Sequence, residues 1–326
     1  MPQTLPIIDV GDCLAGRPGA LGHVARAVHD ALTTIGFFLL TGHDVPPALM
    51  QRTFAEAARL HALPMARKLA LRMNEHNNGY MAMSRYAVWT SSVNRNDKPD
   101  LNEAFFIKRE RGPEDPLRRS GRLGLGANVW PDEAELPGFR RNALDYIQAV
   151  DRLACRFLPA LAVALDLPAD YFAAAFAESQ FSFRLSHYPP ATAAPNQFGI
   201  APHTDANFLT FLALSEVPGL QIRMPDGLWL DVPYLPGAFA VNSGDTLQHW
   251  TNGRFLSTPH RVLPPVGRHR YAIPFFLGPH VDTLIACLPG CEDASRPAPP
   301  PIRYGEWLRE WYAANYDPKA QADAAE

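Results

Sequence analysis

The sequence predicts a mainly β protein, in which an antiparallel double-sheet barrel is flanked by helices. Beyond residue 180, short apolar runs separated by turns follow one another closely, which is typical of a sandwich or barrel. The first third instead alternates helical periodicity with short apolar segments, an α/β pattern. Hydrophobic residues make up 47% of the 326 residues, enough for a large core. The 32 prolines indicate many turns, because proline disrupts helix interiors and central strands.

The N-terminal elements follow from apolar spacing and from breakers such as Gly36. Apolar residues three or four apart predict amphipathic helices, and short buried runs predict strands. In chain order we expect a strand over 5–10, a helix over 21–34, a strand over 37–40, a helix over 47–62, long surface loops over 74–120, and a helix with breaks over 136–166.

The second half carries the barrel. Its expected strands are FSFRLSHY, FLTFLALS, LQIRM, LWLDV, FAVNS and YAIPFFL. The expected organisation is an N-terminal α/β region with lid loops packed on the barrel (1–120), helical support (121–180), the barrel core (181–290), and a C-terminal tail and helix (291–326).

The charge balance and the cysteine content indicate which classes of partner and which compartment to expect. The 30 Lys+Arg and 33 Asp+Glu give a net charge of -3, so no basic surplus favours nucleic acid or an anionic membrane. The start of the chain lacks signal-peptide features, and no apolar run approaches the roughly 20 residues of a membrane span. We therefore expect a cytoplasmic monomer or weak homo-oligomer with a small-molecule substrate and scattered reduced thiols at Cys13, Cys155, Cys287 and Cys291.

Three side chains form a candidate metal site. His203 and Asp205 stand two residues apart at the start of a predicted strand, and His260 follows 55 residues after Asp205. Side chains alternate along a strand, so the first two are expected on one face. Two imidazoles and one carboxylate are the facial triad of non-haem Fe(II) enzymes, which leaves metal positions open for other ligands. Since H-x-D alone is common, the neighbouring motifs decide its meaning.

Those motifs resemble a known family. Arg270 lies ten residues after His260, giving H-x-D, a gap of about 50 residues, and then H-x9-R. This pattern resembles the Fe(II)- and 2-oxoglutarate-dependent oxygenases of the isopenicillin N synthase-like group. LPIIDV, the GFF and GH segments, LSHYPP and VNSGDTLQHWTNGRFLSTPHRV resemble further motifs of the same family, so the likeness covers nearly the whole chain.

The resemblance implies a distorted double-stranded β-helix, or jelly-roll, barrel with an N-terminal α/β segment. It implies that His203, Asp205 and His260 are the catalytic Fe(II) ligands, and that 2-oxoglutarate and O2 are cosubstrates. Arg270 would bind the distal carboxylate of 2-oxoglutarate, with Tyr188 and Ser186 as further cosubstrate residues. Two positions depart from the family pattern. Ala272 replaces a serine, and Ser186 replaces an asparagine, so donors to that carboxylate are lost or shortened.

The leading functional hypothesis is an oxygenase of secondary metabolism. It would oxidise an unactivated C–H bond of a small molecule by hydroxylation, desaturation or cyclisation, releasing succinate and CO2. One alternative is an Fe(II) oxidase of the same fold that uses no 2-oxoglutarate; Arg270 favours the first hypothesis, and Ala272 leaves the second open. The other alternative is a catalytically silent small-molecule binding protein, against which the complete triad argues.

Four further residues are candidates for substrate binding. Strand alternation puts Arg184 on the same face as Tyr188, where it would bind a substrate carboxylate or pair with an internal acid. Arg85 and Tyr86 belong either to a polar lid or to an ordinary solvated loop. Phe276 would form an apolar wall of the substrate site or simply pack in the core.

Overall fold

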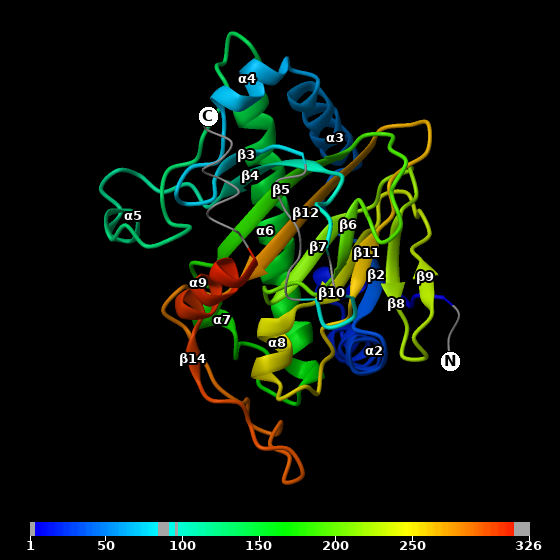
Figure 1. The fold of residues 1–326 in the computed structure, drawn as a ribbon. Helices are drawn as coiled ribbons and strands as arrows, with labels where there is room; N and C mark the ends of the chain where they lie inside the picture. Colours follow the sequence, from blue (N-terminus) through cyan, green and yellow to red (C-terminus); the bar gives the residue numbers. More distant parts are fainter. Residues whose placement is uncertain (1–3, 84–90, 95–96, 316–326) are drawn as a thin grey trace.

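Two β-sheets face each other in a computed structural model that describes residues 4–83, 91–94 and 97–315 (Figure 1). The larger sheet holds, in spatial order, β1 (Ile7–Asp9), β2 (Phe37–Thr41), β10 (Phe239–Ser243), β7 (Leu209–Ala213), β12 (Arg270–Gly278), β5 (Gln180–Tyr188), β4 (Glu103–Lys108) and β3 (Gly79–Met81). The smaller sheet holds β6 (Ile200–His203), β11 (His260–Val262), β8 (Leu220–Arg223) and β9 (Trp229–Asp231). A short pair joins β13 (Leu284–Ile285) to β14 (Ile302–Arg303).

This arrangement confirms the expected jelly-roll barrel. The strands pair antiparallel throughout the barrel, and only β1 and β2 run parallel among the described pairs. The N-terminal strands extend the larger sheet at both edges, because β2 pairs with β10 and β4 pairs with β5. The N-terminal strands β1 to β4 therefore belong to the same sheet as five-residue and longer barrel strands such as β7 and β12.

Helices cover the outer face of the larger sheet, with α6 running along it behind β5 and β12 (Figure 1). Leu153 and Phe157 of α6 are buried in the main core. The helices are α1 (Gly11–Leu14), α2 (Ala20–Thr34), α3 (Pro47–His61), α4 (Met65–Ala70), α5 (Pro116–Arg119), α6 (Phe139–Ala164), α7 (Ala173–Phe176), α8 (Asp245–Trp250) and α9 (Tyr304–Asn315). Within the described part of the chain, no helix combines the length and apolarity needed to cross a membrane.

Several N-terminal expectations hold closely. The helices predicted over 21–34 and 47–62 are α2 and α3, and the strand predicted over 37–40 is β2. Gly36 separates α2 from β2 with a φ of 75°. A Cβ at this position would lie 2.4 Å from the Leu256 carbonyl oxygen, so glycine is required both by the backbone angle and by the close approach.

Two expectations were wrong. The segment over 74–120, predicted as surface loops, contains β4, whose residues are all buried. The strand has a continuous apolar centre, but the charged residues at its two ends, Glu103 and Lys108, are typical of loops and led to the wrong prediction. The helix predicted with breaks over 136–166 is continuous as α6, even at Pro159, because its long apolar face packs against α2, α3 and the sheet.

A buried polar network fastens the helices to this sheet through Glu103. Its carboxylate accepts hydrogen bonds from Lys68 Nζ of α4 at 2.8 Å and from His187 Nδ1 of β5 at 2.7 Å. It also accepts a short hydrogen bond from the Tyr80 hydroxyl, and His61 Nδ1 lies 3.4 Å away. Burial alone would raise the pKa of Glu103, but these donors together hold it well below its usual range.

His61, Glu103 and His187 lie close enough to hold a metal ion. The carboxylate is, however, already compensated by the ammonium of Lys68, which is as buried as its partner. A divalent cation at this position would face that ammonium at short range, and like charges repel strongly where water is excluded. The cluster is therefore interpreted as a structural hydrogen-bond network.

Glu103→Gln is expected to lower the free energy of unfolding by about 3 kcal/mol at pH 7, because it leaves the buried Lys68 without its anion. Glu135→Gln, which removes a surface ion pair with Arg67, should cost at most about 1 kcal/mol. Urea denaturation followed by circular dichroism measures both values.

The cost of Glu103→Gln should shrink in acid. Because the folded-state pKa of Glu103 is depressed, its stabilisation is present above the unfolded pKa of about 4.5 and is lost as the pH falls below it. Wild type should then lose about 1.4 kcal/mol per pH unit relative to the variant. A difference between the two proteins that does not change between pH 5 and pH 3 would contradict this assignment.

Candidate functional site

The smaller sheet brings the two predicted histidine ligands together. His203 ends β6 and His260 begins β11, and the two residues are direct partners across the antiparallel pair. Their ring centroids lie 4.3 Å apart. Asp205 lies in the loop just beyond β6, so the proximity of Asp205 to the histidines comes from this loop and not from strand alternation as predicted. Its Oδ1 lies 3.9 Å from His203 Nε2 and 3.7 Å from His260 Nε2.

Each imidazole is oriented by the backbone two residues before it. His203 Nδ1 donates to the Ala201 carbonyl at 2.8 Å, and His260 Nδ1 donates to the Thr258 carbonyl at 3.1 Å. Fixing the proton on Nδ1 leaves the Nε2 lone pair of each ring free and aimed at the same point, which is how metal-binding histidines are commonly held.

The carboxylate of Asp205 is oriented from the larger sheet. Its Oδ2 accepts hydrogen bonds from Thr210 Oγ1 of β7 at 2.6 Å and from Asn242 Nδ2 of β10 at 2.9 Å. These bonds leave Oδ1 facing the imidazoles. The sequence analysis missed both donors, although Asn242 lies in the VNSGD segment that it singled out.

A close backbone approach holds the Asp205 loop in place. The N–H of Asp245 donates to the Asp205 carbonyl at 2.7 Å. A Cβ on the preceding Gly244 would lie 2.7 Å from that carbonyl oxygen and 2.0 Å from the Asn207 carbonyl oxygen. Only glycine therefore allows the start of α8 to rest on this loop.

The protonation states suit metal binding. Burial and the neighbouring imidazole of His260 lower the pKa of His203 to about 3, so the ring is neutral near pH 7. Burial alone would raise the pKa of the Asp205 carboxyl, but the two imidazoles and the two hydrogen bonds hold it below its usual range. His203 thus offers a neutral nitrogen and Asp205 a carboxylate oxygen.

This donor set fits a divalent iron ion. Bond lengths near 2.1 Å place neighbouring donors of an octahedral ion about 3 Å apart, so the observed separations need to close by less than 1 Å. Three donors converging on one side leave the opposite side open, and imidazole with carboxylate is the set found in non-haem Fe(II) oxygenases.

Beside the triad, β5 and β12 form a cationic recess. Arg270 faces Tyr188 across this strand pair, and Ala272 faces Ser186. The guanidinium of Arg270 stacks over the Tyr188 ring at 4.9 Å, and its Nε donates to the Val217 carbonyl at 3.2 Å. Arg270 Nη1 and Ser186 Oγ are buried without a partner among the described residues.

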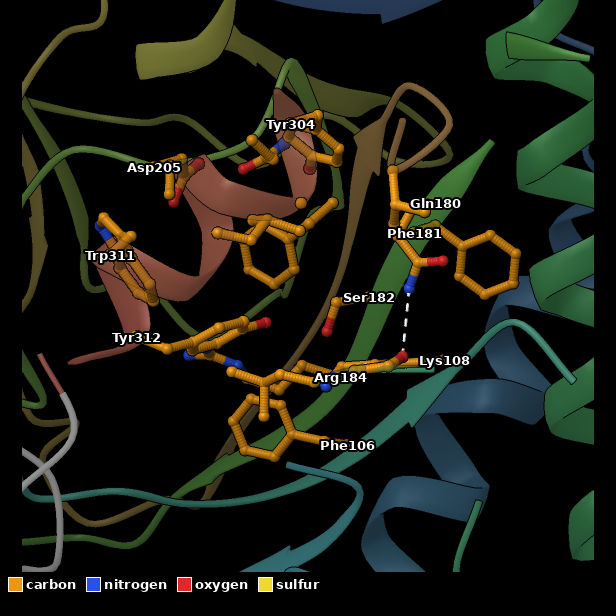
Figure 2. A pocket seen from close by; sticks show the side chains of 18 of the residues that line it. Phe106, Lys108, Gln180, Phe181, Ser182, Arg184, Asp205, Tyr304, Trp311 and Tyr312 are labelled. Carbon is orange, nitrogen blue, oxygen red and sulfur yellow. Dashed lines mark hydrogen bonds between the residues drawn. The ribbon is translucent and has the colours of Figure 1, made fainter. Parts of the chain in front are cut away.

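The triad also borders a cavity of about 920 Å³ that includes its open mouth. Arg184 projects into it from β5, with its guanidinium 4.7 Å from the Phe106 ring and 5.2 Å from the Phe276 ring. Helix α9 closes one side of the cavity and carries Trp311 and Tyr312 toward it (Figure 2).

The predicted internal acid for Arg184 is absent from the described residues. Arg184 makes no ion pair with a described carboxylate, and its Nε is buried without a partner there. The nearby Asp100 instead accepts a hydrogen bond from the Ala201 N–H at 2.9 Å. Burial raises the pKa of Asp100 to about 8, so this carboxyl is largely neutral near pH 7.

The structure brings seven of the predicted site residues to a recess between the sheets that adjoins this cavity: His203, Asp205, His260, Arg270, Tyr188, Ser186 and Arg184, with Phe276 on its wall. Arg85 and Tyr86 lie outside the described residues. The sequence analysis missed Lys108 as a cavity residue, because the segment around it was interpreted as a loop.

Two family models match this chain. The 2OG-Fe(II) oxygenase superfamily matches residues 179–279, which hold the triad and the arginine recess. The model described as non-haem dioxygenase in morphine synthesis N-terminal matches residues 5–133.

Individual relatives are similar over most of the chain. The 2-oxoglutarate-Fe(II) type oxidoreductase hxnY of Emericella nidulans is 34% identical, covering 97% of this chain and 91% of the relative. The Validamycin A dioxygenase of Streptomyces hygroscopicus subsp. limoneus is 31% identical over 81% of this chain and 73% of the relative.

Solved structures agree with this likeness. A full-length Neurospora crassa protein, solved in complex with alpha-KG, which is 2-oxoglutarate, superposes with a TM-score of 0.82 at 28% identity, covering 95% of this chain and 96% of that chain. The oxidase hypothesis without 2-oxoglutarate is not favoured. The chain belongs to the 2OG-Fe(II) oxygenase superfamily, and it is a dioxygenase that uses Fe(II), 2-oxoglutarate and O2.

Proposed function

We propose that His203, Asp205 and His260 ligate the catalytic Fe(II), and that Arg270 binds the distal carboxylate of 2-oxoglutarate. The observation that carries this assignment is the guanidinium of Arg270, which is 3% exposed and lacks a carboxylate partner among the described residues. A buried charge is costly unless it is paired, and a planar guanidinium suits a bidentate carboxylate.

Tyr188 and Ser186 complete the proposed cosubstrate site. The Tyr188 ring stacks against the guanidinium of Arg270. The unpartnered hydroxyl of Ser186 belongs to the residue that pairs with Ala272 across the two strands. Ser186 therefore takes over the hydroxyl donor that the family places at position 272. This strand pair therefore keeps one hydroxyl donor, at position 186, where the family has an asparagine at 186 and a serine at 272.

Bound Fe(II), 2-oxoglutarate and O2 together supply an oxidant that attacks a substrate C–H bond, with release of succinate and CO2. The chain's own residues orient and shield this chemistry. The carbonyls of Ala201 and Thr258 hold the Nδ1 protons of the two histidines, so both rings ligate through Nε2. The aromatic walls of the cavity exclude water from the reacting centre.

We infer that the substrate is a small molecule that lies against Arg184 and Phe276. Both side chains line the cavity next to His203 and Asp205. The similar Neurospora crassa protein has been solved with thymine and with 5-formyluracil, which are small ring compounds.

The assignment predicts turnover of 2-oxoglutarate. Protein reconstituted with Fe(II) and supplied with 2-oxoglutarate, ascorbate and O2 is expected to release succinate slowly even without a substrate, measured by mass spectrometry. His203→Ala should abolish this release because it removes a metal ligand. His280→Ala, which alters a histidine outside the cavity, should leave it unchanged. Succinate release by His203→Ala at the wild-type rate would refute the proposed triad.

Ser186 and Ala272 allow a reciprocal test of the cosubstrate site. Ser186→Ala is expected to weaken 2-oxoglutarate binding about fivefold, since a lost hydrogen bond costs about 1 kcal/mol. Ala272→Ser should tighten it by a similar factor. The dissociation constant is measured by anaerobic calorimetry with the Fe(II) protein.

The double variant Ser186→Ala/Ala272→Ser should return the dissociation constant to near the wild-type value. It moves the single hydroxyl from position 186 to position 272, which is its direct partner across the strand pair. An unchanged constant in Ser186→Ala would show that this hydroxyl does not contact the cosubstrate.

A further inference from the structure

A second cation, Lys108, lines the same cavity as Arg184. Lys108 of β4 pairs with Ser182 of β5, and Phe106 pairs with Arg184. Lys108 and Arg184 therefore lie two residues apart along the strand direction, a rise of about 7 Å, and both face the cavity. Both side chains line the cavity that reaches His203 and Asp205 (Figure 2).

Lys108 is buried without a counter-ion among the described residues. It is 3% exposed, and its Nζ makes one hydrogen bond, to the His76 carbonyl oxygen. The ammonium also lies 5.4 Å from the centre of the Tyr312 ring. Burial is the cause that lowers the pKa of Lys108 to about 7, which is the direction expected of an ammonium whose anion is missing.

Comparison with Lys68 shows that Lys108 lacks a carboxylate partner among the described residues. Lys68 is equally buried, but the carboxylate of Glu103 lies 2.8 Å from its Nζ. A buried ammonium is costly unless it is paired, and the fold supplies a partner at one site and not at the other. The unpaired ammonium is the one that faces the cavity.

The remaining cavity wall is partly aromatic. Gln180 adds one polar group beside Lys108, and its Oε1 is buried without a partner among the described residues. The aromatic side chains come from β4, β12 and α9, and they are Phe106, Phe276, Tyr304, Trp311 and Tyr312. Such walls fit a planar ring, and two cations repel a positively charged substrate.

We propose that Lys108 anchors a carboxylate of the substrate, and that the enzyme acts on a ring-containing carboxylic acid. This inference rests on the proposed function, because it takes the cavity beside the triad as the substrate site. The acid lies with its carboxylate at Lys108 and its ring between Lys108 and the metal centre. Arg184, stacked between Phe106 and Phe276, contacts the part of the ring nearer the metal.

Paired probes test the anchor directly. Benzoate, phenylacetate and 3-phenylpropanoate are each compared with the corresponding primary amide, which has a similar shape and no charge. Binding to the anaerobic holoenzyme with Fe(II) and 2-oxoglutarate is followed by tryptophan fluorescence, since Trp311 lines the cavity. We expect at least one acid to bind tenfold or more tightly than its amide.

The variants separate charge from shape. Lys108→Met should abolish the preference for the acid, and Lys108→Arg should retain it. Lys98→Met is the matched control, because Lys98 bonds the Pro195 carbonyl outside the cavity. Lys108→Met should unfold at the same or a higher temperature than wild type, since it removes a buried charge without a partner.

The possible outcomes separate failure of the Lys108 anchor from failure of the proposed function on which it rests. If wild type fails to bind 2-oxoglutarate, the proposed function itself is refuted. If 2-oxoglutarate binds normally but every acid binds no better than its amide, or no acid binds, Lys108 is not a carboxylate anchor. An acid preference that persists in Lys108→Met would overturn the inference as well.

Discussion

The carboxylate of Asp205 is the interaction on which the site depends, because it joins the two sheets. One oxygen accepts hydrogen bonds from Thr210 and Asn242 on the larger sheet. The other oxygen faces His203 and His260, which the smaller sheet holds in register. A small change in the separation of the sheets would therefore move the carboxylate away from the imidazoles. Metal binding in turn ties the sheets together, so the ion is expected to contribute to the stability of the barrel.

The space between the sheets concentrates polar groups that the protein itself does not satisfy. Buried polar atoms are normally hydrogen-bonded, yet Arg270, Ser186 and Arg184 each hold an atom without a partner among the described residues. In the Glu103 network, on the outer face of the sheet, the same fold pairs a buried ammonium with a buried carboxylate. The unpartnered atoms of Arg270, Ser186 and Arg184 lie on the cavity side of β5 and β12. A bound ligand can satisfy them there, and they cost stability when it is absent.

The sequence was enough to predict the barrel, the triad and the arginine recess, because motif spacing and a family resemblance carry that information. It was not enough to predict β4, since Glu103 and Lys108 are typical of loops and become strand residues only through partners far away in the chain. The donors Thr210 and Asn242 were missed for the same reason: their role depends on how β7 and β10 pair with each other. Strand alternation correctly put Arg184 beside Tyr188 on the cavity face, whereas the position of Asp205 depends on a loop held down by α8.

The most direct test is an anaerobic titration of the metal-free protein, first with Fe(II) and then with 2-oxoglutarate, followed in the visible spectrum. A weak band should develop on adding 2-oxoglutarate, vanish in Asp205→Ala, and require a much higher 2-oxoglutarate concentration in Arg270→Gln. Iron binding without any band at saturating 2-oxoglutarate would contradict the proposed cosubstrate site. Failure to bind iron at all would contradict the triad.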